Sequence, residues 1–359
     1  MSAQALPRPE DKKRRNVKKV RQEGGSAQPQ PWLDRQPGIC ARYSMKAMTV
    51  LGLIITFVAI AVLVIEFLRH PRSRLPLYGW FGLGIFAVAG WLMFRRFTPV
   101  ITYFTPIAWT AYILLTDAGV YAITGHSRLR NHPAEFARMA LLSIPLWLIF
   151  EAYNLRLHNW VYTGLPASRA LALLGYGWSF ATITPGILET ADLVEAFGWF
   201  SPAAAWRFSA RAQAAMMIFG GACLALPLVL PQVTAAYLFA LVWVGFIFLL
   251  DPINLRLRLP SILGDFAAGR RSRFYSLLIS GFVCGWLWEF WNYWAAAKWH
   301  YIFPMFQDLK IFEMPAPGYL GFLPFALECF VMYITASWLV ARPAAATLNS
   351  RLPGASQDS

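Results

Sequence analysis

The chain has 359 residues, of which 57% are hydrophobic and only 14% charged, and its formal net charge at pH 7 is +14. Its mean hydropathy of +0.46 excludes an ordinary soluble globule and is typical of a polytopic membrane protein. The apolar segments leave no room for a sizeable soluble domain, so we expect an all-α fold in the cell inner (cytoplasmic) membrane.

The first 45 residues differ in composition from the rest. They contain the basic stretch EDKKRRNVKKVRQEGGSAQPQP, which predicts a disordered, solvated tail and no specific nucleic-acid partner. The first apolar run begins near Met48, so the layout of a signal peptide is absent. The sequence leaves open whether this tail is translated or whether translation starts near Met45 or Met48.

A membrane-spanning helix needs about 20 mainly apolar residues. The sequence predicts about nine such spans, at 46–68, 77–94, 102–124, 138–157, 172–197, 212–230, 233–251, 274–298 and 319–341. The last 18 residues, 342–359, are predicted to be a second disordered tail. The four cysteines show no CxxC spacing, and we predict neither a metal site nor a disulfide.

Basic residues concentrate in alternate loops. Fifteen Lys and Arg residues occupy one set of loops and six occupy the other set. The positive-inside rule places the richer set in the cytoplasm, namely 69–76, 125–138, 198–211, 252–273 and the C-terminal tail. With nine spans the N-terminus would then lie outside, although the N-terminal tail carries 11 basic residues. This conflict leaves the orientation of the N-terminus open.

Two segments of the chain share an unusual set of polar residues. EAYNLRLHNWVY begins at Glu151 and EFWNYWAAAKWHY begins at Glu289, and each has an asparagine three residues later. The first segment continues with Trp160 and Tyr162, and the second with Trp299 and Tyr301. Glutamate and asparagine at this spacing lie on one face of a helix.

The match extends in both directions along the chain. Upstream, WTAYILLTD ends at Asp117 and WVGFIFLLD ends at Asp251; downstream, PGILE ends at Glu189 and PFALE ends at Glu328. Because the order and spacing agree, we predict a duplicated three-helix unit in parallel orientation. The predicted parts are two added helices (46–101), unit one (102–198), a linker helix (199–232) and unit two (233–341).

Six carboxyl groups at membrane depth favour a function in proton transfer. A charged carboxylate there costs about 2.5–3.5 kcal/mol, so we expect some of the six to be protonated and able to act as proton donors. Aromatic side chains concentrate near the same helix ends and would stabilise a carbocation. Alternatively, the asparagines and carboxylates join helices by hydrogen bonds, and the aromatic residues form an interfacial belt.

This architecture resembles the membrane-integral lycopene cyclases, whose members consist of two three-helix units, separate or fused. The matching stretches are WHYIFPMFQDLKIFEMPAPGYLGFLPFALE and, less closely, WVYTGLPASRALALLGYGWSFATITPGILE, within residues 102–341. The chain departs from that family in having Pro-x-x-x-Glu with a single glutamate, where members have Pro-x-Glu-Glu. The resemblance implies an isomerase or lyase of carotenoid biosynthesis that needs no cofactor.

The resemblance also implies roles for individual residues. Glu189 and Glu328 would be the proton donors, and Glu151 and Glu289 their partners. The full set of candidate catalytic residues is Glu328, Glu189, Glu289, Glu151, Asn292, Asn154, Asp117 and Asp251. The candidate substrate-binding residues are Trp160, Tyr162, Trp299, Tyr301, Tyr176 and Tyr319.

The expected partners are membrane lipids and an apolar, isoprenoid-type small molecule; the oligomeric state is open. A proton-coupled transporter would use parallel repeats and intramembrane carboxylates equally well. A non-catalytic assembly or lipid-binding protein is the third alternative.

Overall fold

The computed structural model describes residues 39–70 and 73–349, with side chains for 46–70 and 73–341. Residues 1–38 and 350–359 of the two predicted tails lie outside the described residues, whereas residues 39–45 and 342–349, which were predicted to be disordered, are helical as parts of α2 and α15. In chain order the helices and strands are α2 (Ile39–Arg69), α3 (Leu77–Phe94), α4 (Thr98–Thr102), α5 (Phe104–Thr124), α6 (Arg128–Asn131), α7 (Pro133–Leu157), β1 (Trp160–Thr163), α8 (Arg169–Ala181), α9 (Ile183–Ala196), α10 (Ala210–Val229), α11 (Gln232–Ala235), α12 (Phe239–Arg256), α13 (Ile262–Ala267), α14 (Ser272–Trp294), β2 (Lys298–Tyr301), β3 (Lys310–Ile311), β4 (Met314–Pro315), η1 (Ala316–Gly321) and α15 (Phe322–Asn349).

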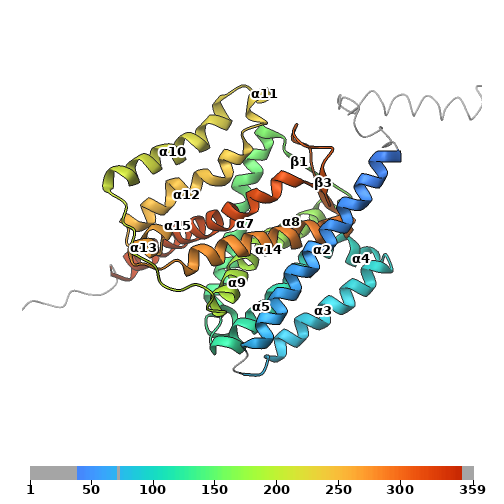
Figure 1. Cartoon of the computed structure of the whole chain (residues 1–359), viewed down its shortest axis with the longest axis horizontal. Helices are drawn as coiled ribbons and strands as arrows, with labels where there is room; N and C mark the ends of the chain where they lie inside the picture. Colours follow the sequence, from blue (N-terminus) through green and yellow to red (C-terminus); the bar gives the residue numbers. More distant parts are fainter. Residues whose placement is uncertain (1–38, 71–72, 350–359) are drawn as a thin grey trace, which may run out of the picture. The chain divides into compact units, whose positions relative to one another are not determined.

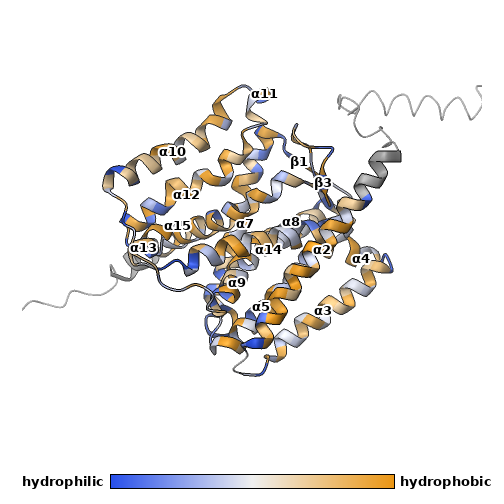
Figure 2. Ribbon diagram, viewed as in Figure 1, coloured by the Kyte–Doolittle hydropathy of each residue, from blue (hydrophilic) through white to orange (hydrophobic). Residues whose placement is uncertain are grey.

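The prediction of an all-α polytopic membrane protein agrees with the apolar character of these helices. Within the described residues, eight helical segments are long and apolar enough to cross a membrane. Helix α14, which was predicted as a span at 274–298, is 23 residues long but is not among the eight. Its glutamate, asparagine and several tryptophans and tyrosines lower its hydropathy. Figure 2 shows hydrophobic residues along the helices and hydrophilic residues gathered mainly where helices end.

The helices differ in how deeply they lie within residues 45–359. In the most apolar 18-residue stretch of α5, 61% of the residues are buried, whereas 17% are buried in the corresponding stretch of α2. Helices α7, α14 and α15 lie centrally, with α10 and α12 on one side and α2 and α3 on the other (Figure 1). Small residues allow close packing at the periphery: a Cβ on Gly220 of α10 would lie 2.5 Å from the backbone nitrogen of Leu249 in α12.

The predicted span 172–197 is two helices, α8 and α9, interrupted at Thr182. Pro185 lacks a backbone N–H, so the helical hydrogen bonds cannot continue unbroken through this turn. Ser143 of α7 bridges the interruption: its hydroxyl donates to the carbonyl of Phe180 at 2.5 Å and accepts from the amide of Thr184 at 3.0 Å. The neighbouring helix therefore stabilises the break.

The loops lie at two opposite ends of the helices. At one end, Ala203 donates its amide to the carbonyl of Gly269 at 2.8 Å, which joins two of the Arg-rich loops. At the other end, β1 and β2 pair in antiparallel fashion, with Trp160 opposite Tyr301 and Tyr162 opposite Trp299. Strands β3 and β4 form a second small pair at residues 310–315.

Candidate functional site

Glu151 lies near the end of α7 and receives hydrogen bonds from the strand that follows. Its Oε1 accepts from Trp160 Nε1 at 3.3 Å and from the Tyr162 hydroxyl at 2.5 Å. Trp147, one turn earlier on α7, donates its Nε1 to the same oxygen at 2.8 Å. Burial, and then the charge of Glu151, raises the pKa of Tyr162 well above its usual range, so this phenol keeps its proton.

Glu289 lies near the end of α14 in a closely similar arrangement. Its Oε1 accepts from Trp299 Nε1 at 3.3 Å and from the Tyr301 hydroxyl at 2.9 Å. Burial, and then the charge of Glu289, raises the pKa of Tyr301 well above its usual range. Each half of the chain thus holds one glutamate, one tryptophan and one tyrosine in the same hydrogen-bonded relation.

The two asparagines hold these strands against their helices. Asn154 donates to the Trp160 carbonyl at 2.9 Å, and its Oδ1 accepts from the amides of Asn159 and Trp160 at 2.8 and 3.1 Å. Asn292 donates to the Trp299 carbonyl at 2.9 Å and accepts from the Trp299 amide at 3.0 Å. Each asparagine shares a helix face with its glutamate, as predicted, but bonds to the strand backbone. Both are therefore positioning residues.

The pairing of β1 with β2 brings the two sets together around one cavity. The cavity has about 1000 Å³ of empty space, a volume that includes solvent at its open side. Thirteen of its 24 lining residues are aromatic: Tyr103, Trp109, Trp147, Trp160, Tyr162, Tyr176, Phe180, Trp243, Trp288, Trp299, Tyr301, Phe322 and Phe325. An apolar ligand would be surrounded by ring faces and edges from both halves of the chain.

Five of the six predicted substrate-binding residues line this cavity, and Tyr319 does not. Tyr319 stacks on Trp286, with ring centroids 3.9 Å apart, and donates its hydroxyl to the carbonyl of Ile311 at 2.9 Å. Its counterpart Tyr176 borders the cavity and packs edge-on against Tyr162, with ring centroids 5.0 Å apart.

The two glutamates differ in their surroundings. Glu151 is half-buried, whereas Glu289 is 0% exposed and its Oε2 has no hydrogen-bond partner among the described residues. The third donor of Glu151, Trp147, has no equivalent in the second half, because the matching position is Gly285. A Cβ on Gly285 would lie 2.3 Å from the side chain of Phe322, which fills that space.

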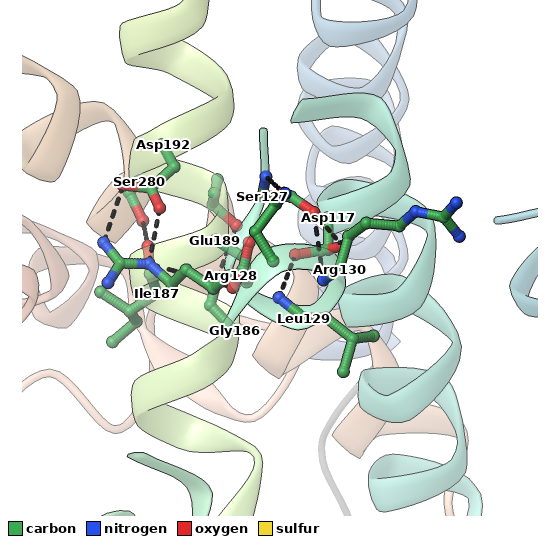
Figure 3. A network of polar contacts seen from close by, with 12 residues as sticks. Asp117, Ser127, Arg128, Leu129, Arg130, Gly186, Ile187, Glu189, Asp192 and Ser280 are labelled. Carbon is green, nitrogen blue, oxygen red and sulfur yellow. Dashed lines mark hydrogen bonds and ion pairs between the residues drawn. The ribbon is translucent and has the colours of Figure 1, made fainter. Parts of the chain in front are cut away.

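Glu189 lies away from the cavity lining, in a polar network beside the loop that holds α6. It is 0% exposed on α9, and Arg128 Nε lies 4.0 Å from its Oε1. The same guanidinium donates its Nε and Nη2 to the two oxygens of Asp192, at 2.6 and 3.0 Å (Figure 3). The sequence analysis missed Arg128 because a basic loop near a span end is adequately explained by membrane topology.

Asp117 and Asp251 stabilise the short helices that follow them. Asp117 accepts from the Leu129 amide at 2.9 Å and the Ser127 hydroxyl at 2.8 Å (Figure 3). It also accepts from the Tyr78 hydroxyl at 2.6 Å. Asp251 accepts from the first two backbone amides of α13, at 2.7 and 2.9 Å. Carboxylates commonly satisfy free amides at helix starts in this way. Neither aspartate lines the aromatic cavity.

Glu328 lies on α15 and is 0% exposed, and neither of its carboxyl oxygens has a hydrogen-bond partner among the described residues. Its counterpart Glu189 has Arg128 nearby, but the position equivalent to Arg128 is Ile262, each being eleven residues after its aspartate. Glu328 does not line the aromatic cavity. None of the four glutamates lines the cavity, but Glu151 and Glu289 hydrogen-bond to tyrosines that do, whereas Glu189 and Glu328, predicted as proton donors, have no such bond among the described residues.

Several cavity residues were not among the predicted site residues. They include Trp109 and Trp243, which stand eight residues before Asp117 and Asp251. This shared spacing was the available signal, since a matched tryptophan pair in a duplicated unit favours a shared site. Trp288 and Phe325 gave no such signal, because their counterparts are Phe150 and Gly186.

A small charged cluster lies on the far side of β2 from the glutamates. His300 Nδ1 is 2.8 Å from Glu313 Oε2, and Lys298 Nζ is 3.6 Å from Glu313 Oε1. Burial opposes ionisation of Glu313, but its hydrogen bond with His300 and the charges of His300, Lys298 and Lys310 lower its pKa below the usual value of 4.5. This cluster fixes the loop that carries β3 and β4 to the strand bordering the cavity.

No protein-family model matches the chain, and neither a curated protein nor a solved structure matches it. The candidate site consequently rests on the geometry of the described residues.

Proposed function

We propose that the protein is a membrane-integral isomerase or cyclase that binds an apolar, isoprenoid-type molecule in the aromatic cavity. The observation that carries this proposal is the convergence of two Glu–Tyr–Trp sets on one cavity through the β1–β2 pair. Cation-stabilising rings on the cavity wall, together with two tyrosines of that wall that hydrogen-bond to glutamates, suit chemistry through a carbocation.

The two glutamates take different roles in this proposal. A buried charge without a partner is costly, so Glu289, with one buried oxygen unpartnered, carries the proton. Glu151, whose Oε1 accepts three hydrogen bonds, acts as the base. Tyr301 and Tyr162 border the cavity and are the catalytic residues that touch the substrate, and each relays a proton to or from its glutamate.

The reaction conserves atoms and electrons without a redox partner. The electron pair of a substrate C=C bond forms a new C–H bond with the Tyr301 proton, while Tyr301 takes the carboxyl proton of Glu289. The resulting carbocation rearranges or closes a ring against the tryptophan faces. A neighbouring C–H bond then gives its proton through Tyr162 to Glu151, and its electron pair forms a new C=C bond. Glu151 then releases its proton to water in the open cavity, and Tyr301 passes a proton from that water to the buried Glu289, which completes the cycle.

The duplicated architecture is part of the same proposal. Unit one comprises α5, α7, α8 and α9, unit two comprises α12, α14, η1 and α15, and α10 links them. Asn154 and Asn292 make equivalent hydrogen bonds in their own halves of the chain, and so do Asp117 and Asp251. This equivalence supports a common origin of the two units. In this arrangement α14 also spans the membrane, eighth of nine in chain order, and its neighbours shield it from lipid. The resemblance to the membrane-integral lycopene cyclases adds support for an isoprenoid substrate.

The test compares lipid extracts of cells that produce the wild type, Glu289→Gln, Tyr301→Phe or Tyr319→Phe. Loss of a proton-transfer group costs roughly 100-fold or more in rate, so the first two variants should accumulate one precursor and lack one product. Tyr319→Phe is the matched control, because Tyr319 is buried and hydrogen-bonded but does not line the cavity. Equal lipid profiles in all four strains would contradict the proposal.

A proton-coupled transporter is the second candidate. The observation that favours it is the network of Glu189, Arg128 and Asp192, which holds a buried carboxylate away from the cavity. Unchanged lipid profiles together with proton flux in liposomes, abolished by Glu189→Gln, would support transport.

A further inference from the structure

Among the described residues that line the aromatic cavity, one buried hydroxyl has no hydrogen-bond partner. Thr105, in the first turn of α5, lines the cavity and is 5% exposed, and its Oγ1 has no hydrogen-bond partner among the described residues. A buried hydroxyl without a partner is destabilising. Its persistence within a cavity lining is therefore informative about what the cavity binds.

Other helical threonines of this protein show how Thr105 differs. Five of them donate to the backbone carbonyl four residues earlier, at 2.7 to 2.9 Å: Thr56, Thr110, Thr124, Thr190 and Thr335. For Thr105 that carbonyl belongs to Ile101, which accepts the amide of Ala296 at 2.8 Å instead. A helical threonine has two accessible χ1 rotamers, so the hydroxyl can turn toward the cavity.

The backbone beside Thr105 is also suited to a polar group. The residue before α5, Tyr103, provides no side-chain cap and donates its hydroxyl to the carbonyl of Leu171 at 3.0 Å. First-turn amides of a helix lack partners within the helix and carry partial positive charge. In this turn Pro106 has no N–H, and Ile107 donates its amide to the Tyr103 carbonyl at 3.1 Å. A ligand oxygen next to Thr105 would therefore meet the hydroxyl and the amides of Phe104 and Thr105.

The second half of the chain lacks this feature. The residue equivalent to Thr105 is Phe239, each being twelve residues before its aspartate. Phe239 stacks on Phe303, with ring centroids 4.8 Å apart. Phe239 does not line the cavity, so the unpartnered hydroxyl marks the helix start of the first half only, which would orient an elongated ligand.

We infer that Thr105 and the first turn of α5 form a subsite for an oxygen-bearing end of the substrate. The substrate class is an isoprenoid with a neutral hydroxyl or carbonyl group, and this assignment rests on the proposed function of the cavity. Lys298, the one charged residue lining the cavity, donates to the Tyr293 carbonyl at 2.6 Å and lies 3.6 Å from Glu313. That cation is already engaged, which favours a neutral oxygen group over an anionic one.

The test measures binding to the purified full chain in nanodiscs by quenching of tryptophan fluorescence. The probes are geranylgeraniol and the hydrocarbon with the same chain but no hydroxyl. We expect the wild type to bind the alcohol about tenfold more tightly, the factor that 1.4 kcal/mol gives. Thr105→Val should remove this preference, Thr105→Ser should retain it, and Thr56→Val, whose hydroxyl bonds within α2, is the matched control.

The outcomes separate this inference from the function on which it rests. If the wild type binds both probes equally, or if Thr105→Val keeps the preference, the subsite is wrong although the cavity still binds isoprenoids. If the wild type binds neither probe, both the subsite and the proposed substrate class are wrong.

Discussion

Trp160 and Tyr301 face each other across the β1–β2 pair, although 141 positions separate them in the chain. The two residues donate hydrogen bonds to different glutamates, Trp160 to Glu151 and Tyr301 to Glu289. The reciprocal pair, Tyr162 and Trp299, also lies opposite across the strands, so each half contributes one tryptophan and one tyrosine to the cavity wall. The site therefore exists only when both halves are folded together.

Replacing Asn292 by Ala should destabilise the protein by about 1–3 kcal/mol, because it removes two hydrogen bonds between the buried Asn292 amide and the backbone of Trp299 in β2. The thermal midpoint in detergent, followed by tryptophan fluorescence, should fall by several degrees. Asn154→Ala should behave alike, since Asn154 makes three equivalent bonds. Unchanged midpoints in both variants would rule out the positioning role.

Asp251→Asn should lower stability while leaving the rate of any proton-dependent reaction almost unaltered. The carboxylate accepts two backbone amides at the start of α13, and an amide side chain can accept only with its one oxygen. We expect a loss of about 1–2 kcal/mol in the free energy of unfolding. Asp308→Asn, at an exposed residue, serves as the control. A collapse of activity in a folded Asp251→Asn protein would instead mark this aspartate as a proton-transfer group.

Acid should weaken the loop held by Glu313. Because the folded-state pKa of Glu313 lies below its usual value of 4.5, its contribution to stability is complete above that value and is lost as the pH falls through the folded pKa. The thermal midpoint of the wild type should therefore fall more steeply between pH 6 and pH 3 than that of Glu313→Gln, by roughly 1–3 °C. Parallel pH profiles for the two proteins would show that the contacts with His300 and Lys298 do not stabilise the loop.

Arg128→Gln should destabilise the protein by about 1–3 kcal/mol, because it leaves the carboxylates of Glu189 and Asp192 without their cation. Arg130→Gln is a matched change two residues away, since the Arg130 guanidinium lies over the ring of Tyr121 at 5.3 Å and forms no ion pair within the described residues. Chemical unfolding of both variants in the same detergent should give a clearly larger loss for Arg128. Equal losses would mean that the buried Glu189 does not depend on Arg128.

The sequence identified the two matched sets, Glu151 with Trp160 and Tyr162 and Glu289 with Trp299 and Tyr301, because their spacing repeats. It could not assign the polar partners. Asn292 and Glu289 share a helix face as predicted, yet an amide both donates and accepts, and the free backbone of β2 satisfies both functions. Asp251 was a candidate catalytic residue, but a carboxylate that transfers protons and one that binds helix amides look alike in a sequence.

The amino-acid sequence by itself determined the membrane class and the matched motifs, because hydropathy and spacing are properties of local segments. Only the tertiary structure decided which residues share the cavity, since that depends on the pairing of two strands more than a hundred residues apart. It also decided that Tyr176 borders the cavity while Tyr319 does not. Equivalent residues of a repeat occupy different surroundings once Gly285 and Phe322 take the space that Trp147 fills in the first half. Packing volume, which spacing along the chain does not record, distinguishes the two halves.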